Sequence, residues 1–234
     1  MAGNGRVISV APQRLAGWLR RFDEAHGATP DSLDGNLLVV AGADGARAEI
    51  RLGWEPLIPP PDGAVREAVL AYLVAPRRVG AVLVRKGGFA VGRFVGSELA
   101  AAKVGARHVQ GRTKAGGWSQ QRYARRREHQ AHRAYSAAAD TVAAILGDDP
   151  GDFVVAGGDK GAVTAVLADP RLSRVQQAWV LAGRPVLPVA DPNRAVLVAF
   201  ADQFRAVTIS LNTAAQQLGQ GASRPIDHPP SDGE

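Results

Sequence analysis

The sequence contains no cysteine in its 234 residues. This excludes a disulfide framework, a thiolate metal site such as a zinc knuckle, and a cysteine nucleophile. The chain also lacks an uninterrupted apolar stretch of about 18 residues, which a membrane-spanning helix needs, and its N-terminus lacks a long apolar signal core. We therefore expect a soluble, monomeric protein of the cytoplasm that has no membrane partner.

Negative charge is scarce in one segment, residues 103–133, where Glu128 is the only acidic residue. Nine basic residues against this one leave an excess of eight positive charges, more than the +6 of the whole chain. The basic residues are Lys103, Arg107, Arg112, Lys114, Arg122, Arg125, Arg126, Arg127 and Arg133. A codon bias toward arginine can explain a general excess but not this clustering. The segment is therefore expected to attract a polyanion such as RNA, whose phosphates suit the planar guanidinium group.

The length of the chain favours two units over one. Residues 1–60 show a short strand at 6–10, an amphipathic helix at 11–26 and a hairpin across Gly42 to Gly45, which together predict a small α+β unit. Four prolines between residues 56 and 61 exclude helix and remove ladder donors. We place the boundary there.

Residues 61–214 alternate between strand and helix patterns, which predicts an α/β (α+β) fold with a mixed sheet flanked by helices. Residues 215–234 are polar and rich in proline and glycine, which predicts a disordered tail. The expected helices cover residues 62–73, 119–146, 159–167 and 192–204, and the expected strands cover residues 79–85, 89–95, 103–110, 153–156, 176–181 and 207–211.

The most informative stretch lies inside the basic segment, where Gly116 and Gly117 precede Trp118 and Ser119. The two glycines let a loop approach another backbone closely, and Ser119 is a natural N-cap for the helix that follows. On spacing alone a simple turn is the more common explanation. The basic residues on both sides of the loop favour a phosphate-directed tip instead.

Two further patterns are weaker. His129 and His132 are three residues apart on the predicted helix, but no third ligand is apparent, so we expect a solvated or RNA-facing pair and no metal site. The stretch 154–161 resembles a strand followed by a phosphate loop, yet it lacks both the Walker and the dinucleotide spacing. Asp159 is expected to cap the next helix, and no cofactor is expected.

The stretch GGWSQQRYARRREHQAHR resembles the catalytic loop and following helix in the central domain of archaeal and eukaryotic peptide-chain release factors. Those proteins have Gly-Gly-Gln, then Ser, then an Arg-aromatic-Ala-Arg helix, which residues 122–125 match here. Residues 80–95 and 153–172 are similar to the opening hairpin and to a strand, turn and helix of that domain. The likeness covers about residues 75–185. It is closest to the Vms-one-like release factors of ribosome quality control, and within them to an actinobacterial group described as peptidyl-tRNA hydrolases.

The resemblance implies codon-independent hydrolysis of peptidyl-tRNA on stalled large ribosomal subunits. An alignment on the Ser and the arginine motif places Trp118 at the usual catalytic glutamine, whereas the pattern of the quality-control branch indicates Gln120, with Gln121 as its substitute. The implied catalytic residues are Gln120, Gly116, Gly117, Ser119 and Gln121. The implied RNA-binding residues are Arg112, Lys114, Trp118, Arg122, Arg125, Arg126, Arg127, His129 and Arg133.

Several functions stay open at this point. The domain could cleave the 3′ end of the tRNA instead of the ester bond, or it could bind the ribosome or RNA without catalysis. Trp118 could stack on a base or fold the loop onto its own domain. A small-molecule enzyme is disfavoured because we find no acid/base pair to support it.

Overall fold

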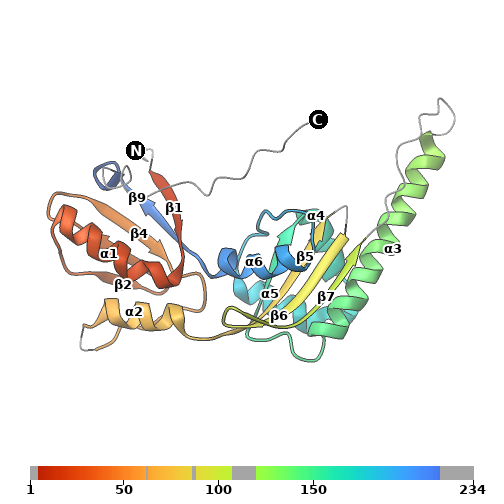
Figure 1. Cartoon of the computed structure of the whole chain (residues 1–234), viewed down its shortest axis with the longest axis horizontal. Coiled ribbons are helices and arrows are strands. Elements are labelled where there is room, and N and C mark those ends of the chain that lie inside the picture. Colours follow the sequence, from red (N-terminus) through yellow and green to blue (C-terminus); the bar gives the residue numbers. More distant parts are fainter. Residues whose placement is uncertain (1–4, 62, 86–87, 107–119, 217–234) are drawn as a thin grey trace. The chain divides into compact units, whose positions relative to one another are not determined.

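A computed structural model gives the structure of the chain (Figure 1). It describes residues 5–61, 63–85, 88–106 and 120–216, and for residues 106 and 120–132 it describes the backbone only. The chain forms two compact units: unit 1 consists of Met1–Leu52, Pro56–Leu73 and Val207–Glu234, and unit 2 of Gly53–Glu55 and Val74–Ala206. The expected α/β (α+β) class is confirmed, since both units combine sheets with helices.

Unit 1 is built on a five-stranded antiparallel sheet. Its strands, in spatial order, are β1 (Arg6–Val10), β9 (Val207–Leu211), β4 (Arg47–Arg51), β3 (Leu37–Ala41) and β2 (Ser32–Asp34). The helix α1 (Pro12–His26) lies across the strands and buries Leu15, Leu19 and Phe22 against them, and α2 (Val65–Val74) adds Val69 and Leu73 to the same core (Figure 1).

Local chemistry sets the ends of α1. Pro12 occupies the first turn, where its missing N–H costs nothing, and Gly27 ends the helix with φ of 74°. His26 lies in the last turn, and its Nδ1 is 2.7 Å from Asp44 Oδ2 in the β3–β4 turn. This hydrogen bond from His26 lowers the pKa of Asp44 and ties the helix end to the hairpin.

Unit 2 contains a four-stranded mixed sheet. Its strands, in spatial order, are β7 (Glu98–Ala106), β6 (Gly88–Val95), β5 (Arg78–Arg85) and β8 (Phe153–Gly158). The pair β5–β8 is parallel and the other pairs are antiparallel, as the alternation of strands and helices predicts. The helices α3 (Gln120–Leu146), α4 (Lys160–Leu167), α5 (Ser173–Ala182) and α6 (Arg194–Arg205) flank the sheet.

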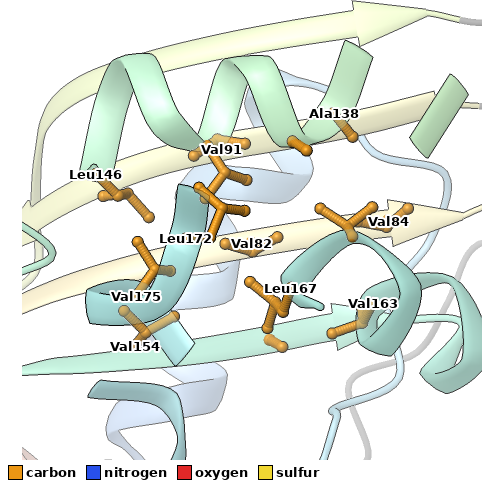
Figure 2. Close-up of a cluster of buried hydrophobic side chains, with 14 of the residues drawn as sticks. Val82, Val84, Val91, Ala138, Leu146, Val154, Val163, Leu167, Leu172 and Val175 are labelled. Atoms are coloured by element: carbon orange, nitrogen blue, oxygen red, sulfur yellow. The ribbon is translucent and has the colours of Figure 1, made fainter. Parts of the chain in front are cut away.

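Three helices cover one face of this sheet. Val82 and Val84 of β5 point into a cluster with Val91 of β6 and Val154 of β8, and side chains of α3, α4 and α5 close it (Figure 2). The helix residues are Ala138, Ala139, Val142, Leu146, Ala162, Val163, Val166, Leu167, Val175 and Ala178. Successive strand residues point to opposite faces of the sheet, so the same strands also pack against α6 on the other face. There, the ring centroids of Phe94 and Phe204 are 5.3 Å apart.

The structure corrects two predicted strands. Residues 176–181 are part of α5, because Val175, Ala178 and Ala182 recur at helical spacing toward the core, while Val180 and Leu181 are 69% and 73% exposed. The strand expected at 103–110 begins at Glu98, and residues 107–110 lie outside the described residues. The strand β2 was not predicted, because it has only three residues.

The units are not cut at residue 60. The helix α2 and the strand β9, which the sequence analysis assigned to the second domain, contribute Val69, Leu73 and Ile209 to the core of unit 1. Ala215, predicted to begin the disordered tail, is fully buried in that core, and residues 217–234 lie outside the described residues. Sequence patterns locate elements but do not show which distant strand completes a sheet.

The segment Gly53–Glu55 belongs to unit 2 although its neighbours on both sides belong to unit 1. Trp54 is buried there, with its ring 5.0 Å from that of Phe153 and with the Arg184 guanidinium 4.3 Å from its centroid. Arg184 Nε also donates to the Gly53 carbonyl at 2.8 Å. The tryptophan is therefore a fixed part of unit 2.

Gly80 of β5 allows the end of α3 to contact the sheet. A Cβ at this position would lie 2.9 Å from both Leu146 Cδ1 and the Pro150 carbonyl oxygen. We predict that Gly80→Ala lowers the free energy of unfolding by about 1–3 kcal/mol, because overpacking forces the helix away from the strand. Urea denaturation measures this.

Gly161→Ala is the matched control. Its added methyl group would meet only Asp159 Oδ1 at 3.4 Å, and alanine favours the helix. This variant is expected to be at least as stable as the natural protein. Equal stability losses in both variants would contradict the role given to Gly80.

Candidate nucleic-acid interface

The basic segment leaves unit 2 at one end of its sheet. Arg85, the last residue of β5, pairs with Gly88 of β6, and Gly88 pairs with Ala106, the last residue of β7. The strands β5 and β7 therefore end at the same edge of the sheet. Gly158, the last residue of β8, pairs with Val84 next to that edge. The strand β7 therefore ends, at Ala106, beside the carboxyl ends of the parallel strands β5 and β8, where ligands bind in open α/β sheets.

The structure places the predicted site residues in three groups. Gly116, Gly117, Trp118, Ser119, Arg112 and Lys114 lie outside the described residues. Gln120, Gln121, Arg122, Arg125, Arg126, Arg127 and His129 lie in the first half of α3, of which the backbone is described. Arg133 is exposed. The predicted helical part of the site is thus one continuous helix, and contacts among the side chains of the tip stay predictions.

The second half of α3 is a core element. The predicted apolar seam is confirmed for Ala138 and Val142, which are buried, and for Tyr135 and Ile145, which pack against the same cluster. The first half extends past the end of the sheet in Figure 1. At 1.5 Å per residue, the 13 residues from Gln120 to Arg133 correspond to about 20 Å. The helix therefore carries its charged half away from the core while its apolar half stays fixed.

A partly buried arginine contacts the far end of this helix. Arg93 of β6 donates from Nη2 to the carbonyl of Ile145 at 2.5 Å. The last carbonyls of a helix have no intrahelical donor and carry a partial negative charge. A guanidinium at this end supplies both a hydrogen-bond donor and a positive charge. Arg93 was not among the predicted residues, although a charged residue inside the apolar strand Gly88–Val95 is a usable signal.

A second arginine fixes the middle of α3. Arg171, in the short helix η2 (Pro170–Leu172), contacts Asp140 of α3 at 2.8 Å and Asp169 at 2.7 Å. Hydrogen bonds from the Arg171 side chain and backbone N–H lower the pKa of Asp169 from 3.8 to about 2. This network lies on the surface, and it connects α3 to the segment that leads into α5.

The first turn of α3 has electrostatic properties of its own. Gln120 and Gln121 are its first two residues. The backbone N–H groups of a first turn have no intrahelical acceptors, and the helix dipole adds about half a positive charge there. A glutamine at this position adds a carboxamide that both donates and accepts hydrogen bonds. Such an arrangement can orient a water molecule and stabilise a developing oxyanion.

The turn between β8 and α4 is occupied by its own side chain. Asp159 Oδ1 accepts from the N–H groups of Gly161 at 3.0 Å and Ala162 at 3.2 Å, which confirms the predicted cap. These amides are the ones that a phosphate would need. The structure therefore gives no support to nucleotide binding at this turn.

The Arg171 network predicts a dependence of stability on pH. Since the pKa of folded Asp169 is about 2, against 3.8 as its ordinary value, its contribution is complete above about pH 4 and is lost as the pH falls toward 2. We predict that Asp169→Asn, which keeps an oxygen for the Arg171 N–H, flattens the pH dependence of unfolding in this window. Urea denaturation at pH values between about 2 and 5 tests this. The control is Asp148→Asn, at an exposed carboxylate without an ion pair among the described residues. It should keep the pH dependence of the natural protein. A curve for Asp169→Asn that runs parallel to that of the natural protein would contradict the prediction.

Within the part of the chain that the structure describes, no helix is both long and apolar enough to cross a membrane.

Comparison with known proteins agrees with the geometry of unit 2. No curated protein matches the sequence. Residues 77–210 match the family described as "Actinobacteria/chloroflexi VLRF1 release factor". The match begins just before β5 and ends within β9, so it contains the sheet of unit 2, the basic segment and all of α3. It covers more than half of the chain, and the protein belongs to this release factor family.

Proposed function

We propose that the protein is a codon-independent peptidyl-tRNA hydrolase that frees nascent chains from tRNA on stalled large ribosomal subunits, as part of ribosome quality control in the cytoplasm. The observation that carries this proposal is the placement of the excess charge. The segment 103–133 joins the end of an edge strand to a helix whose second half is fixed in the core. A helix that is held in this way and carries the basic residues of 122–133 suits entry into a cavity lined by RNA.

The chemistry proposed for the tip is positioning. A glutamine cannot act as a general base, but its carboxamide can hold a water molecule against the ester carbonyl of peptidyl-tRNA. The first-turn N–H groups of α3 can then stabilise the oxyanion that forms. Gln120 is assigned this role, with Gln121 as the alternative and Ser119 as the helix cap. Gly116 and Gly117 let the loop pass through a narrow channel.

The remaining basic residues bind phosphates without reading sequence. Arg112 and Lys114 precede the tip, and Trp118 is available to stack on a base. On the helix the same role falls to Arg122, Arg125, Arg126, Arg127, His129 and Arg133. The partners proposed are the large ribosomal subunit and peptidyl-tRNA, bound by a monomer without a cofactor.

Independence from the stop codon is proposed from the extent of the family match, which begins at residue 77. The matched region contains the helix that carries the tip, whereas Met1–Leu52 of unit 1 lies outside it. The described part of unit 1 has as many acidic as basic side chains, seven of each, so it adds no net attraction for RNA. In this proposal unit 1 replaces the decoding domain of full release factors.

The tip glutamines are tested by single-turnover release of a labelled peptide from stalled large subunits. We predict that Gln120→Ala lowers the release rate by about 100-fold or more, because it removes the group that holds the water, and that binding to the subunit is retained. Gln121→Ala is the matched control and should lose much less. The opposite order would move the catalytic role to Gln121, and normal release by both variants would contradict catalysis by a tip glutamine.

The same reactions distinguish the competing activities. Intact tRNA with its terminal CCA indicates ester hydrolysis, whereas a shortened tRNA indicates cleavage of the 3′ end. Binding to the subunit without any release by the natural protein would indicate a non-catalytic factor.

A further inference from the structure

The carboxyl end of the unit 2 sheet carries cations that do not belong to the tip loop. Lys103 of β7 lies three residues before the end of its strand, and Lys160 begins α4 two residues after Gly158. Arg133 is on α3, and the packing of this helix shows how far along the sheet Arg133 lies. Leu146, at the other end of the helix, lies over Gly80, near the start of β5. The 13 residues between Arg133 and Leu146 span about 20 Å, close to the length from Gly80 to Arg85, so Arg133 lies level with the strand ends.

These three side chains, which we call the collar, are exposed. Among the described residues no carboxylate lies within 4.0 Å of Lys103, Arg133 or Lys160, so none of them has an ion pair there. The acidic residues near this end are already engaged. Asp159 caps α4 through two backbone N–H groups, and Asp191 lies 3.5 Å from Arg85. The charge of the collar is therefore available to a partner.

The opposite end of the same sheet carries carboxylates. Asp149 and Asp152 lie there, both paired with Arg78, and the exposed Asp148 has no ion pair among the described residues. Glu98 begins β7 at this end and is exposed. The carboxylates of this end lie about 20 Å from the collar, one strand length, and Arg78 and Arg174 lie among them.

We infer that the collar extends the phosphate-contacting surface from α3 to the end of the sheet through Lys103 and Lys160, and that it binds the RNA backbone around the entrance that the tip passes through. The inference rests on the proposed function and adds a limit on how far the protein enters the RNA. The tip enters, and Lys103, Lys160 and Arg133 contact phosphates at the rim of the entrance. Lysine suits this role because an ammonium group on a flexible stem can contact phosphates in several geometries.

The test measures the dissociation constant of the full chain for purified large ribosomal subunits carrying peptidyl-tRNA, between about 50 and 200 mM salt. The double variant Lys103→Gln and Lys160→Gln should bind about tenfold more weakly at physiological salt, and the slope of log K against log salt should fall by about two, one per lost phosphate contact. Both changes are at exposed positions, so folding is retained.

The matched control removes the same charge at the acidic end, with Arg174→Gln and Arg205→Gln. Arg174 Nη1 is 3.5 Å from the Asp148 carbonyl, and Arg205 follows Phe204, which contacts Phe94 near the end of β6. This control should keep the slope of the natural protein and lose less than about twofold in affinity.

The outcomes separate the two proposals. An unchanged slope for the lysine variant, in a protein whose binding still depends on Arg125 and Arg126, overturns the collar and leaves the proposed function standing. Equal losses in the lysine and control variants also overturn the collar, because net charge alone would then explain them. Absence of any salt-dependent binding by the natural protein overturns both proposals.

Discussion

The packing of the second half of α3 on the sheet of unit 2 is the constraint on which the rest of this structure depends. Leu146 and Val142 are fully buried, Gly80 lets the helix end approach the strand, and Arg93 satisfies the Ile145 carbonyl. Without these contacts the like charges of residues 122–133 would favour an unstructured segment. The apolar half stabilises the helix, and the charged half is thereby held in a defined direction.

A long helix also magnifies small errors at its base. From Leu146 to Gln120 the distance along the axis is about 40 Å, so a tilt of about 3° moves the first turn by about 2 Å. The catalysis by positioning that we propose would tolerate much less than this. The sheet, Arg93 and Arg171 contact α3 at different points along its second half. The stability of the core and the direction of α3 thus depend on the same residues.

Much of this arrangement could be predicted from the sequence, because local patterns determine it. The seam of Tyr135, Ala138 and Val142, the apolar run of β8 and the cap at Asp159 all depend on residues close in the chain. The α5 prediction was wrong because the run Trp179 to Leu181 is apolar although Val180 and Leu181 face outward. Pairing across long distances, as between β9 and β4, leaves no local pattern. Side-chain geometry at the tip depends on contacts that a sequence pattern does not contain, so the roles of Gln120 and its neighbours stay predictions.

The position of β9 has a consequence for the order in which the protein is made. This strand lies between β1 and β4, and its residues 207–211 come after the whole of unit 2. During synthesis, unit 2 can fold as soon as α6 has emerged, because its sheet needs nothing that follows. Unit 1 is synthesised first but completes its folding later. Until Ile209 and its neighbours leave the exit tunnel, β1 has no partner strand and β4 has an open edge. A chain that ends prematurely before residue 207 would therefore release a complete second unit attached to an unfinished first one.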